Sequence, residues 1–275
     1  MDEQHPFKSR IERLDVPSGM VALGALGQSG FAIKAGDMIA YIDPYLSGTV
    51  GGAGGSGRAI EIPITPEEVT HADLLLCTHE HRDHTDVETV VPLAAASPGA
   101  PIFVSPQGHT LLRDAGIADE RLVLPRLGET QTVGSMRVTA IPAAHYDFEV
   151  DAEGHARWMG FMIEVDGVTL YHSGDTIIIP ELIAALESFR IDLALLPING
   201  RDYFREQQQI VGNMNAREVA ELCKLLLPRV LIPTHNDMFA RNRVNPADLV
   251  AELERVAPRQ RFHFLQAGEI FIYCG

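Results

Sequence analysis

The stretch Thr78–His84, THEHRDH, holds three histidines and two carboxylates within seven residues. It directly follows the apolar run Asp73–Cys77, DLLLC, which predicts a buried strand. The ligand-rich stretch therefore begins where that strand leaves the core. In an extended segment alternate side chains share a face, so we expect His79, His81 and Asp83 to point the same way. Neutral imidazoles and carboxylates suit zinc, manganese or iron, and the pattern predicts a metal site.

A pair of metal ions needs more ligands than one loop supplies. His84 is expected to turn toward the other side of the stretch, where the helix predicted over Asp86–Ala96 begins. Three later segments also place a histidine or an aspartate just past an apolar run, which is where α/β proteins carry their sites. These further candidate ligands are His145 after Met136–Ile141, Asp175 after Leu170–His172, and His235 after Val230–Ile232.

Composition limits the classes of protein to which this chain can belong. Of its 275 residues, 46% are hydrophobic and 21% are charged, which is typical of a globular protein. The 37 acidic and 22 basic side chains give a formal charge of −15, which argues against general nucleic-acid binding. No apolar run approaches the roughly 20 residues of a membrane span, and Met1–Arg10 lacks the apolar segment of a signal peptide. With only three cysteines, we expect a cytoplasmic protein without a disulfide framework.

The rest of the chain alternates short apolar runs with helical patterns, and no segment resembles a linker, so residues 1–275 are expected to form one domain. A helix is expected to start at Thr65-Pro66, with a capping box closed by Glu68. Asp166-Gly167 predicts a two-residue hairpin turn, and Phe262–Tyr273 a closing pair of strands. Gly48–Arg58 reads as a surface loop, with a role as a lid left open. The other predicted strands are Val21–Leu26, Phe31–Lys34, Met38–Ile42, Ile102–Ser105 and Ile191–Leu196, and the other predicted helices are Pro180–Phe189, Asn215 to about Leu227, and Pro246–Val256.

The stretch THEHRDH matches the HxHxDH signature of the metallo-β-lactamase superfamily. His145, Asp175 and His235 follow it in the order that this superfamily uses. The resemblance implies an α+β fold, a four-layer αββα sandwich with a dinuclear metal site at the edge between its two sheets. It also implies a distribution of ligands: His79, His81 and His145 for the first ion, Asp83, His84 and His235 for the second, and Asp175 bridging both.

Three segments resemble the lactonase-like branch of the superfamily, which includes L-ascorbate-6-phosphate lactonase. They are Leu26–Phe31 (LGQSGF), Leu170–Asp175 (LYHSGD) and Ile232–Asp237 (IPTHND). The chain is shorter than the ascorbate enzymes and has a plain histidine at His145, so the branch is expected without the ascorbate substrate. Asp83-His84 is intact, unlike the second-site ligands of many class B β-lactamases, and His81 stands where flavodiiron proteins carry glutamate.

The resemblance implies two divalent ions, zinc or manganese first, with iron also compatible. A water bridging two such ions becomes a hydroxide near neutral pH and can attack a lactone carbonyl or a phosphorus centre. Asp83 or Asp175 is expected to hold this nucleophile and pass a proton to the leaving oxygen. The expected enzyme is a hydrolase that opens a lactone or similar ester of a small, anionic, sugar-like molecule. The alternatives are a phosphodiesterase or phosphohydrolase, an iron-dependent oxygenase, and a binding protein with a vestigial site.

Candidate substrate-binding residues lie in the segment that follows the strand predicted over Ile191–Leu196. Arg201 or Arg205 can fork onto a phosphate or carboxylate, or can instead pair with acidic neighbours on a solvated loop. Tyr203 lies between them, and Asn236 directly follows His235. A small-molecule substrate is the expected partner, and a homo-oligomer is compatible with the sequence.

Overall fold

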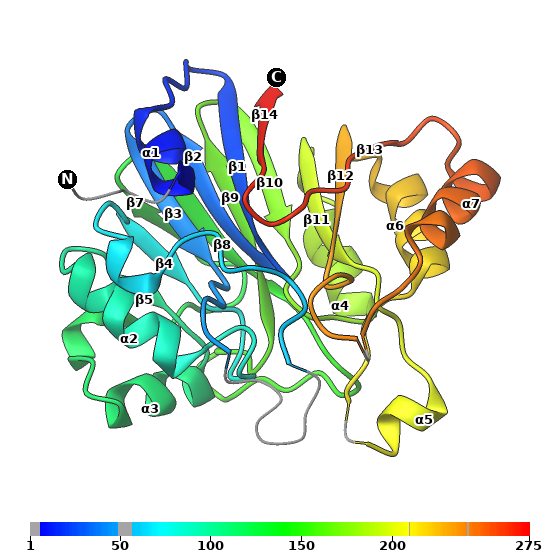
Figure 1. The fold of residues 1–275 in the computed structure, drawn as a ribbon. Coiled ribbons are helices and arrows are strands. Elements are labelled where there is room, and N and C mark those ends of the chain that lie inside the picture. The colour runs from blue at the N-terminus through cyan, green and yellow to red at the C-terminus, as the bar shows by residue number, and fades with distance from the viewer. Residues whose placement is uncertain (1–5, 49–56, 209, 241) are drawn as a thin grey trace.

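The computed structural model describes residues 6–48, 57–208, 210–240 and 242–275. Two seven-stranded sheets form the centre of the fold (Figure 1). The first sheet has the order β14-β1-β2-β3-β4-β5-β6 and the second β13-β12-β11-β10-β9-β8-β7. The first sheet contains β1 (Met20–Gly27), β2 (Gly30–Ala35), β3 (Met38–Ile42), β4 (Leu74–Leu76), β5 (Ile102–Phe103), β6 (Leu122–Val123) and β14 (Ile270–Cys274). The second contains β7 (Thr130–Val133), β8 (Met136–Pro142), β9 (Met159–Val165), β10 (Val168–His172), β11 (Leu193–Pro197), β12 (Val230–Thr234) and β13 (Arg261–Phe262).

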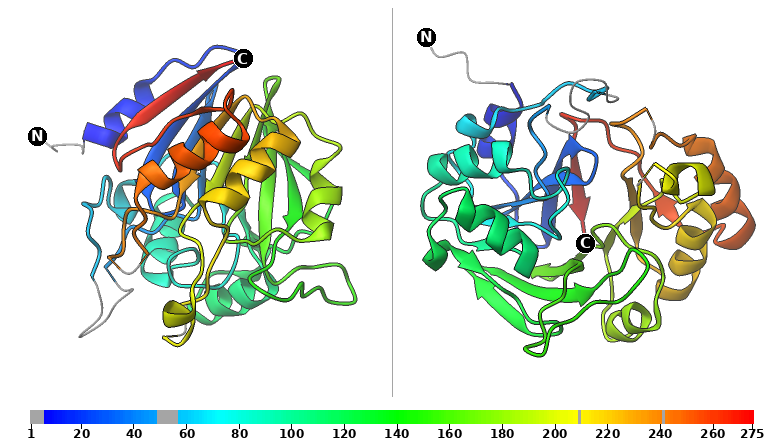
Figure 2. Two further views of the ribbon diagram at one scale, coloured as in Figure 1. Left: turned by 90° about the vertical axis from the view of Figure 1, so that its right-hand side faces the viewer. Right: turned by 90° about the horizontal axis from the view of Figure 1, so that it is seen from below.

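Helices cover the outer face of each sheet, as the two further views in Figure 2 show. The helices are α1 (Pro6–Arg13), α2 (Val87–Ala96), α3 (Pro106–Asp114), α4 (Pro180–Leu186), α5 (Tyr203–Glu206), α6 (Ala216–Leu226) and α7 (Pro246–Val256), with 3-10 turns η1 (Pro66–Glu68) and η2 (Asp119–Arg121). Alternation along the strands explains the layers. In β4, Leu74 and Leu76 join the core between the sheets, whereas Leu75 packs in the core beneath α2. The predicted αββα sandwich is confirmed.

The directions of the strands place the loops after β4, β8, β10 and β12 at one edge of the sandwich. In the first sheet β3, β4, β5 and β6 are parallel, and in the second β10, β11, β12 and β13 are parallel. The hairpin between β9 and β10 turns at Asp166-Gly167, whose φ angles of 50° and 82° confirm the predicted turn. Because β8 and β10 are both antiparallel to β9, the ends of β4, β8, β10 and β12 meet at the lower side of Figure 1.

The helix predicted to start at Thr65-Pro66 forms only as the single 3-10 turn η1. The capping box itself is present, since the backbone N–H and the hydroxyl of Thr65 both donate to Glu68 Oε2 at 2.9 Å. The carbonyl of Val69 then accepts a hydrogen bond from the Ser97 hydroxyl, which holds the chain against the end of α2. With β4 beginning at Leu74, too few residues remain for a longer helix.

Both strands of the predicted closing pair form, but they do not pair with each other, because β13 and β14 belong to different sheets. β13 pairs with β12, whereas β14 runs antiparallel to β1. Between them the chain crosses from one sheet to the other through a turn at Gly268, whose φ is 86°. Helix α1, which the sequence analysis misses, packs Phe7 over Gly24, where a Cβ would lie only 2.6 Å from the phenyl ring.

No helix within the described residues has both the length and the apolar character needed to cross a bilayer. The candidate lid, Gly48–Arg58, falls mostly at residues 49–56, which lie outside the described part of the chain.

Candidate metal centre

Seven histidine and aspartate side chains gather at the edge where the two sheets end. Their nitrogen and oxygen atoms form two groups, and within each group these atoms lie within 4.8 Å of one another. The first group is His79, His81, His145 and Asp175, and the second is Asp83, His84 and His235. The loop after β4 of the first sheet contributes His79, His81, Asp83 and His84, and the loops after β8, β10 and β12 of the second sheet contribute the rest. The site therefore exists only where the two sheets meet.

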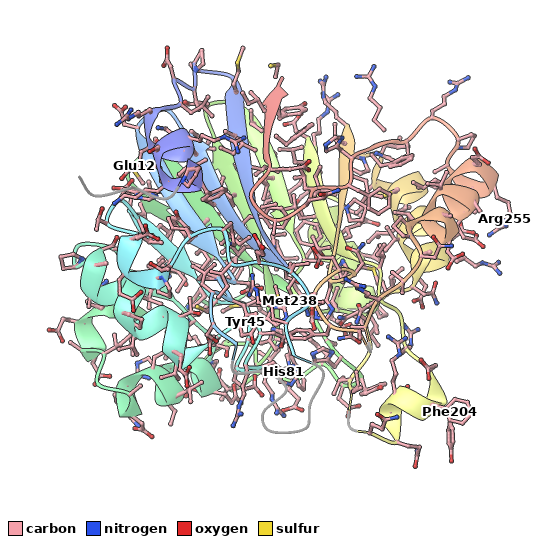
Figure 3. The ribbon with its side chains drawn as sticks, in the orientation of Figure 1. Glu12, Tyr45, His81, Phe204, Met238 and Arg255 are labelled. Carbon is pink, nitrogen blue, oxygen red and sulfur yellow. The ribbon has the colours of Figure 1, made fainter. Side chains whose placement is uncertain are left out.

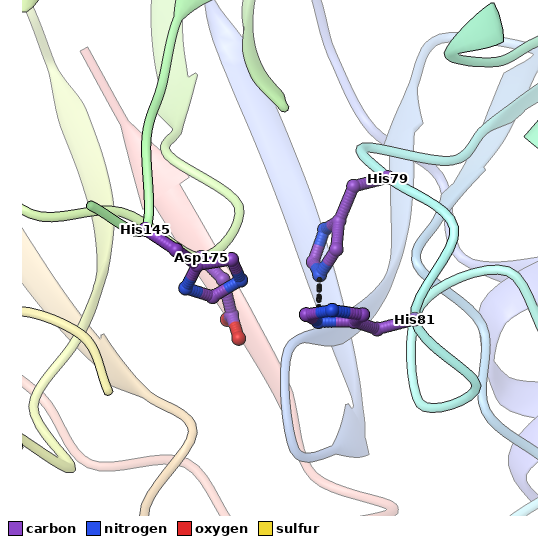
Figure 4. A group of neighbouring side chains, drawn as sticks. All are labelled: His79, His81, His145 and Asp175. Atoms are coloured by element: carbon purple, nitrogen blue, oxygen red, sulfur yellow. Dashed lines mark hydrogen bonds between the residues drawn. The ribbon is translucent and has the colours of Figure 1, made fainter. Parts of the chain in front are cut away.

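The first group places three imidazoles around one point (Figure 4). His79 Nε2 lies 3.0 Å from His81 Nδ1. The ring of His145 lies 5.0 Å from that of His81 and 5.4 Å from that of His79, measured between centroids. Asp175 points toward the same space from the loop after β10 (Figure 4). Three nitrogens and one carboxylate thus converge from two sheets.

Asp175 also reaches the second group. Its Oδ1 lies 3.3 Å from His84 Nε2 and its Oδ2 lies 3.2 Å from His235 Nε2. Asp83 Oδ2 is 3.4 Å from His235 Nε2. Asp175 therefore stands between the two groups and is close to nitrogens of both.

Close backbone contacts bring the loop after β4 onto the second sheet. Gly174 has a φ of 60°, and a Cβ there would lie 2.9 Å from both the Met159 carbonyl oxygen and Thr78 Cβ. Glycine is needed at this point, since any side chain would push the sheets apart. Within the loop, the backbone N–H of His84 donates to the His81 carbonyl at 2.9 Å, and this turn lets His84 face the second group.

The donor set fits divalent cations. Eleven buried side-chain nitrogen and oxygen atoms among the described residues have no hydrogen-bond partner, and three of them are His84 Nε2, His145 Nε2 and Asp175 Oδ1. Unpartnered polar atoms are costly in a protein interior, and these three all belong to the convergent groups. Imidazole nitrogens and carboxylate oxygens are the ligands that zinc, manganese and iron accept. The residues present therefore suit metal ions in both groups.

Burial and neighbouring carboxylates shift the pKa values of the imidazoles in opposite directions. Burial lowers the pKa of His79 well below its usual value and lowers the pKa of His145 to about 4, so both are neutral at pH 7. Burial also disfavours charge on His235, but the carboxylates of Asp175 and Asp83 outweigh it and raise the pKa to about 9. The second group therefore attracts positive charge, which a proton or a metal ion can supply.

Asp43 is a site residue that the sequence analysis misses. It follows β3, is fully buried, and its Oδ2 accepts a hydrogen bond from His84 Nδ1 at 2.7 Å. Its carboxylate also accepts from the backbone N–H and the hydroxyl of Thr78, both at 2.8 Å. Such a partner fixes the imidazole tautomer, so that Nε2 of His84 is left free to bind a cation. The available signal was a carboxylate directly after a strand, the same context that identified the other candidates.

Gln28, in the loop after β1, is a second residue that the sequence analysis misses. Its side-chain nitrogen donates to Asp83 Oδ2 at 2.8 Å and lies 2.9 Å from His235 Nε2. Gln28 and His235 have φ angles of 57° and 58°, and Asp43 has a φ of 43°. Positive φ is unfavourable for side chains other than glycine, and three of the five such residues in the described chain surround this site.

Replacing Gln28 by alanine is expected to weaken metal binding about tenfold, because Asp83 and His235 lose the amide that orients them. Competition with a chromophoric chelator measures this affinity directly. The matched control is Gln107→Ala, which removes the same side chain from an exposed position on α3. Equal affinities in the two variants would contradict an orienting role for Gln28.

One wall of the first group is a stack of three side chains. Arg157 Nη2 donates to Glu80 Oε1 at 2.8 Å, and its guanidinium lies 4.4 Å from the centre of the Trp158 ring. Trp158 in turn meets His145 edge to face, with ring centroids 5.6 Å apart. The stack links the loop after β4 to the loop after β8 and limits how far His145 can move.

None of the four predicted substrate-binding residues belongs to either group, and both arginines have acidic partners. Arg201 forms two hydrogen bonds with Glu218, at 2.9 and 2.6 Å. Arg205 pairs with Asp202 and donates to the Asn199 carbonyl at 2.8 Å.

The other two candidates differ in exposure. Tyr203 is 66% exposed on α5, beside Phe204, which projects from the body of the protein (Figure 3). Asn236 is partly exposed next to His235, and its side chain makes no hydrogen bond with any described residue.

Comparison with known proteins shows which family this chain resembles. The family described as "Beta-lactamase superfamily domain" matches residues 40–236, a range that includes all seven residues of the two groups. The chain is similar to a UPF0173 metal-dependent hydrolase of Archaeoglobus fulgidus, with 33% identity over 81% of this chain and 86% of that protein. A second relative with the same description, from Pyrobaculum calidifontis, is 29% identical over 89% of this chain and 96% of its own length. Among solved structures, a metallo hydrolase from Ignicoccus hospitalis matches with a TM-score of 0.70 at 22% identity, covering 92% of this chain and 98% of that one.

Proposed function

Since this chain belongs to the metallo-β-lactamase superfamily, among its metal-dependent hydrolases, we propose that it binds two divalent ions and opens a lactone or similar ester of a small, anionic, sugar-like molecule. The position of Asp175 carries the proposal, because its two oxygens lie 3.3 and 3.2 Å from nitrogens of His84 and His235 while it also belongs to the first group. Zinc or manganese suits these ligands best, and iron is compatible.

Bound divalent ions would lower the pKa of water and polarise the bond to be cleaved. The chain's own carboxylates then have separate tasks. The Asp83 side chain is 18% exposed, whereas that of Asp175 is only 5% exposed. Asp83 is therefore the group that can reach a substrate, take up the proton that the attacking water loses and hand it to the leaving oxygen, while Asp175 holds the two groups together. Gln28 keeps Asp83 oriented for this step.

An anionic substrate is supported by Arg82, which lies between His81 and Asp83. Its side chain is exposed and forms no ion pair or hydrogen bond with any residue that the structure describes. Arg201 and Arg205, by contrast, would have to leave Glu218 and Asp202 to bind a substrate. We therefore assign recognition of the substrate's negative charge to Arg82 first, and keep Arg201, Tyr203, Arg205 and Asn236 as further candidates.

The proposal predicts about two metal ions per chain in protein purified without added metal. It also predicts hydrolysis of sugar lactones that a chelator abolishes and added zinc or manganese restores. Metal content is measured by mass spectrometry, and the assay compares phosphorylated lactones, neutral lactones and a phosphodiester. Faster turnover of the phosphorylated lactone supports the anionic substrate.

Other outcomes would replace parts of the proposal. Cleavage of the phosphodiester alone would keep the metal centre and change the bond to a phosphoester. One tightly held iron with oxygen uptake and no hydrolysis would indicate an oxygenase. Absence of metal and of every activity would contradict the hydrolase proposal altogether.

A further inference from the structure

A cavity lies at the end of the sandwich opposite the metal centre. It has a volume of about 460 Å³ and is bordered by the last turns of α6 and α7 and by the starts of β12 and β13. The loop from α7 to β13, at the upper right of Figure 1, contributes residues 257–260 to its lining. Its lining residues are Cys223, Lys224, Leu227, Pro228, Arg229, Ala257, Pro258, Arg259, Gln260 and Arg261. The whole of β12 separates Arg229 from His235, roughly 16 Å for five residues, so the two sites are separate.

The lining is basic in a protein that is strongly acidic. It contains four cationic side chains and no carboxylate, although the chain has 37 acidic and only 22 basic residues. Arg229 is bound to Asp192 at 3.1 Å. The side chains of Lys224, Arg259 and Arg261 make no ion pair or hydrogen bond within the described part of the chain. Like charges that gather without partners repel one another, and an anion would relieve this repulsion.

The ends of two helices offset only part of this charge. The carbonyl ends of α6 and α7 both lie at the cavity, and each contributes about half a negative charge. Cations near helix C-termini are common for this reason alone. Together with Asp192, however, the helix ends leave about two positive charges without compensation. The cluster therefore exceeds what capping of the helices requires.

One wall of the cavity is apolar. Leu227 is 74% exposed and has a φ of 51°, a left-handed conformation that is unfavourable for leucine. Pro228, Ala257 and Pro258 extend this wall. Gln260 fixes the two sides of the cavity to each other, because its side-chain nitrogen donates to the Pro228 carbonyl at 2.9 Å and to the Arg261 carbonyl at 2.8 Å. The cavity thus presents an apolar surface beside a cationic one.

We propose that this cavity binds a phosphorylated small molecule that carries an apolar or aromatic body, such as a nucleoside diphosphate. Arginine side chains fork onto phosphate oxygens, and Arg259 and Arg261 supply two of them. The wall at Leu227 and Pro228 would cover the apolar body. The volume lies within the 300–1,000 Å³ or so of ordinary small-molecule sites. A nucleic-acid strand does not fit, because the formal charge of −15 would repel the phosphates beyond the cavity.

Isothermal titration at low ionic strength tests this site, with ADP, pyrophosphate and adenosine as probes, on metal-loaded and on metal-depleted protein. We expect one ADP per chain, with weaker binding of pyrophosphate and adenosine, because each has only half of the required features. The double variant Arg259→Glu/Arg261→Glu is expected to weaken ADP binding at least about tenfold. The matched control is Arg113→Glu/Arg126→Glu, which makes the same change of net charge at exposed arginines far from the cavity.

Three results would overturn the proposal. No heat of binding with ADP or pyrophosphate at about 1 mM would show that the cavity is not an anion site. Equal ADP affinity in the cavity variant and the wild type would place the ligand elsewhere. Loss of ADP binding on removal of metal would place its phosphates at the metal centre. Lys224→Glu, a single exposed change at the same cavity, repeats the test if the double variant does not fold.

Discussion

Replacing Asp175 by asparagine is expected to lower bound metal from about two ions per chain to fewer than one, and to lower turnover about a thousandfold or more. Asparagine has the same shape, but it is neutral and offers one carbonyl oxygen in place of two carboxylate oxygens. Asp175 contacts nitrogens of both His84 and His235 and belongs to the first group as well. Its loss therefore affects both ions. Metal analysis and the lactone assay on the same preparation measure the two effects.

His109→Ala is the control for this variant. His109 lies on α3, 3.6 Å from the surface residue Asp119 and outside both groups, so metal content and turnover are expected to stay at the wild-type values. An Asp175→Asn protein that still bound two ions would exclude the bridging position. A thermal melt of the metal-free variants distinguishes loss of ligands from loss of the fold.

Replacing Asp43 by asparagine is expected to reduce metal affinity about 10- to 100-fold while the metal-binding residues themselves stay intact. The new amide must present either its nitrogen or its oxygen to His84. Presenting the nitrogen sets two donors against each other, and presenting the oxygen leaves Thr78 facing a donor. Either way His84 loses the charged partner, 2.7 Å away, that keeps its Nε2 free for a cation. Equilibrium dialysis against a graded series of chelators measures the change.

Asp73→Asn is the matched control, because Asp73 also uses its carboxylate to hold the first sheet, accepting the backbone N–H of Ile39 at 2.8 Å. It contacts no residue of the metal centre. An equal loss of metal in both variants would mean that Asp43 acts through the stability of the sheet and not through His84.

The sequence was most informative wherever an apolar run was followed by a ligand type. Leu74–Leu76 is apolar on both faces because β4 is buried between the opposite sheet and α2, and this made the strand before His79 easy to recognise. The same local pattern located Asp175 and His235. A hydrophobic run and the residue after it are both read from a few neighbouring positions, which is why the strands and the residues that gather at their ends could be predicted.

Contacts between distant segments could not be read in this way. Asp43 stands 41 residues from His84, and Gln28 stands 55 residues from Asp83. Their roles depend on positive φ angles, which the packing of the two sheets imposes. The residue types at these positions do not predict such angles. The pairing partners of β13 and β14 could not be predicted for the same reason, because the partner of each strand lies far away along the chain.

The pairing of β14 with β1 has a consequence for how this protein is made. Met20 in β1 is paired with Cys274 in β14, so the first sheet lacks its outer strand until the chain as far as β14 has left the ribosome. Such long sequence separation slows folding, since a large loop must close before the contact forms. Until then the edge of β1 is open to strands of other chains, as unpaired edges are. During synthesis the exposed edge of β1 thus needs protection from aggregation.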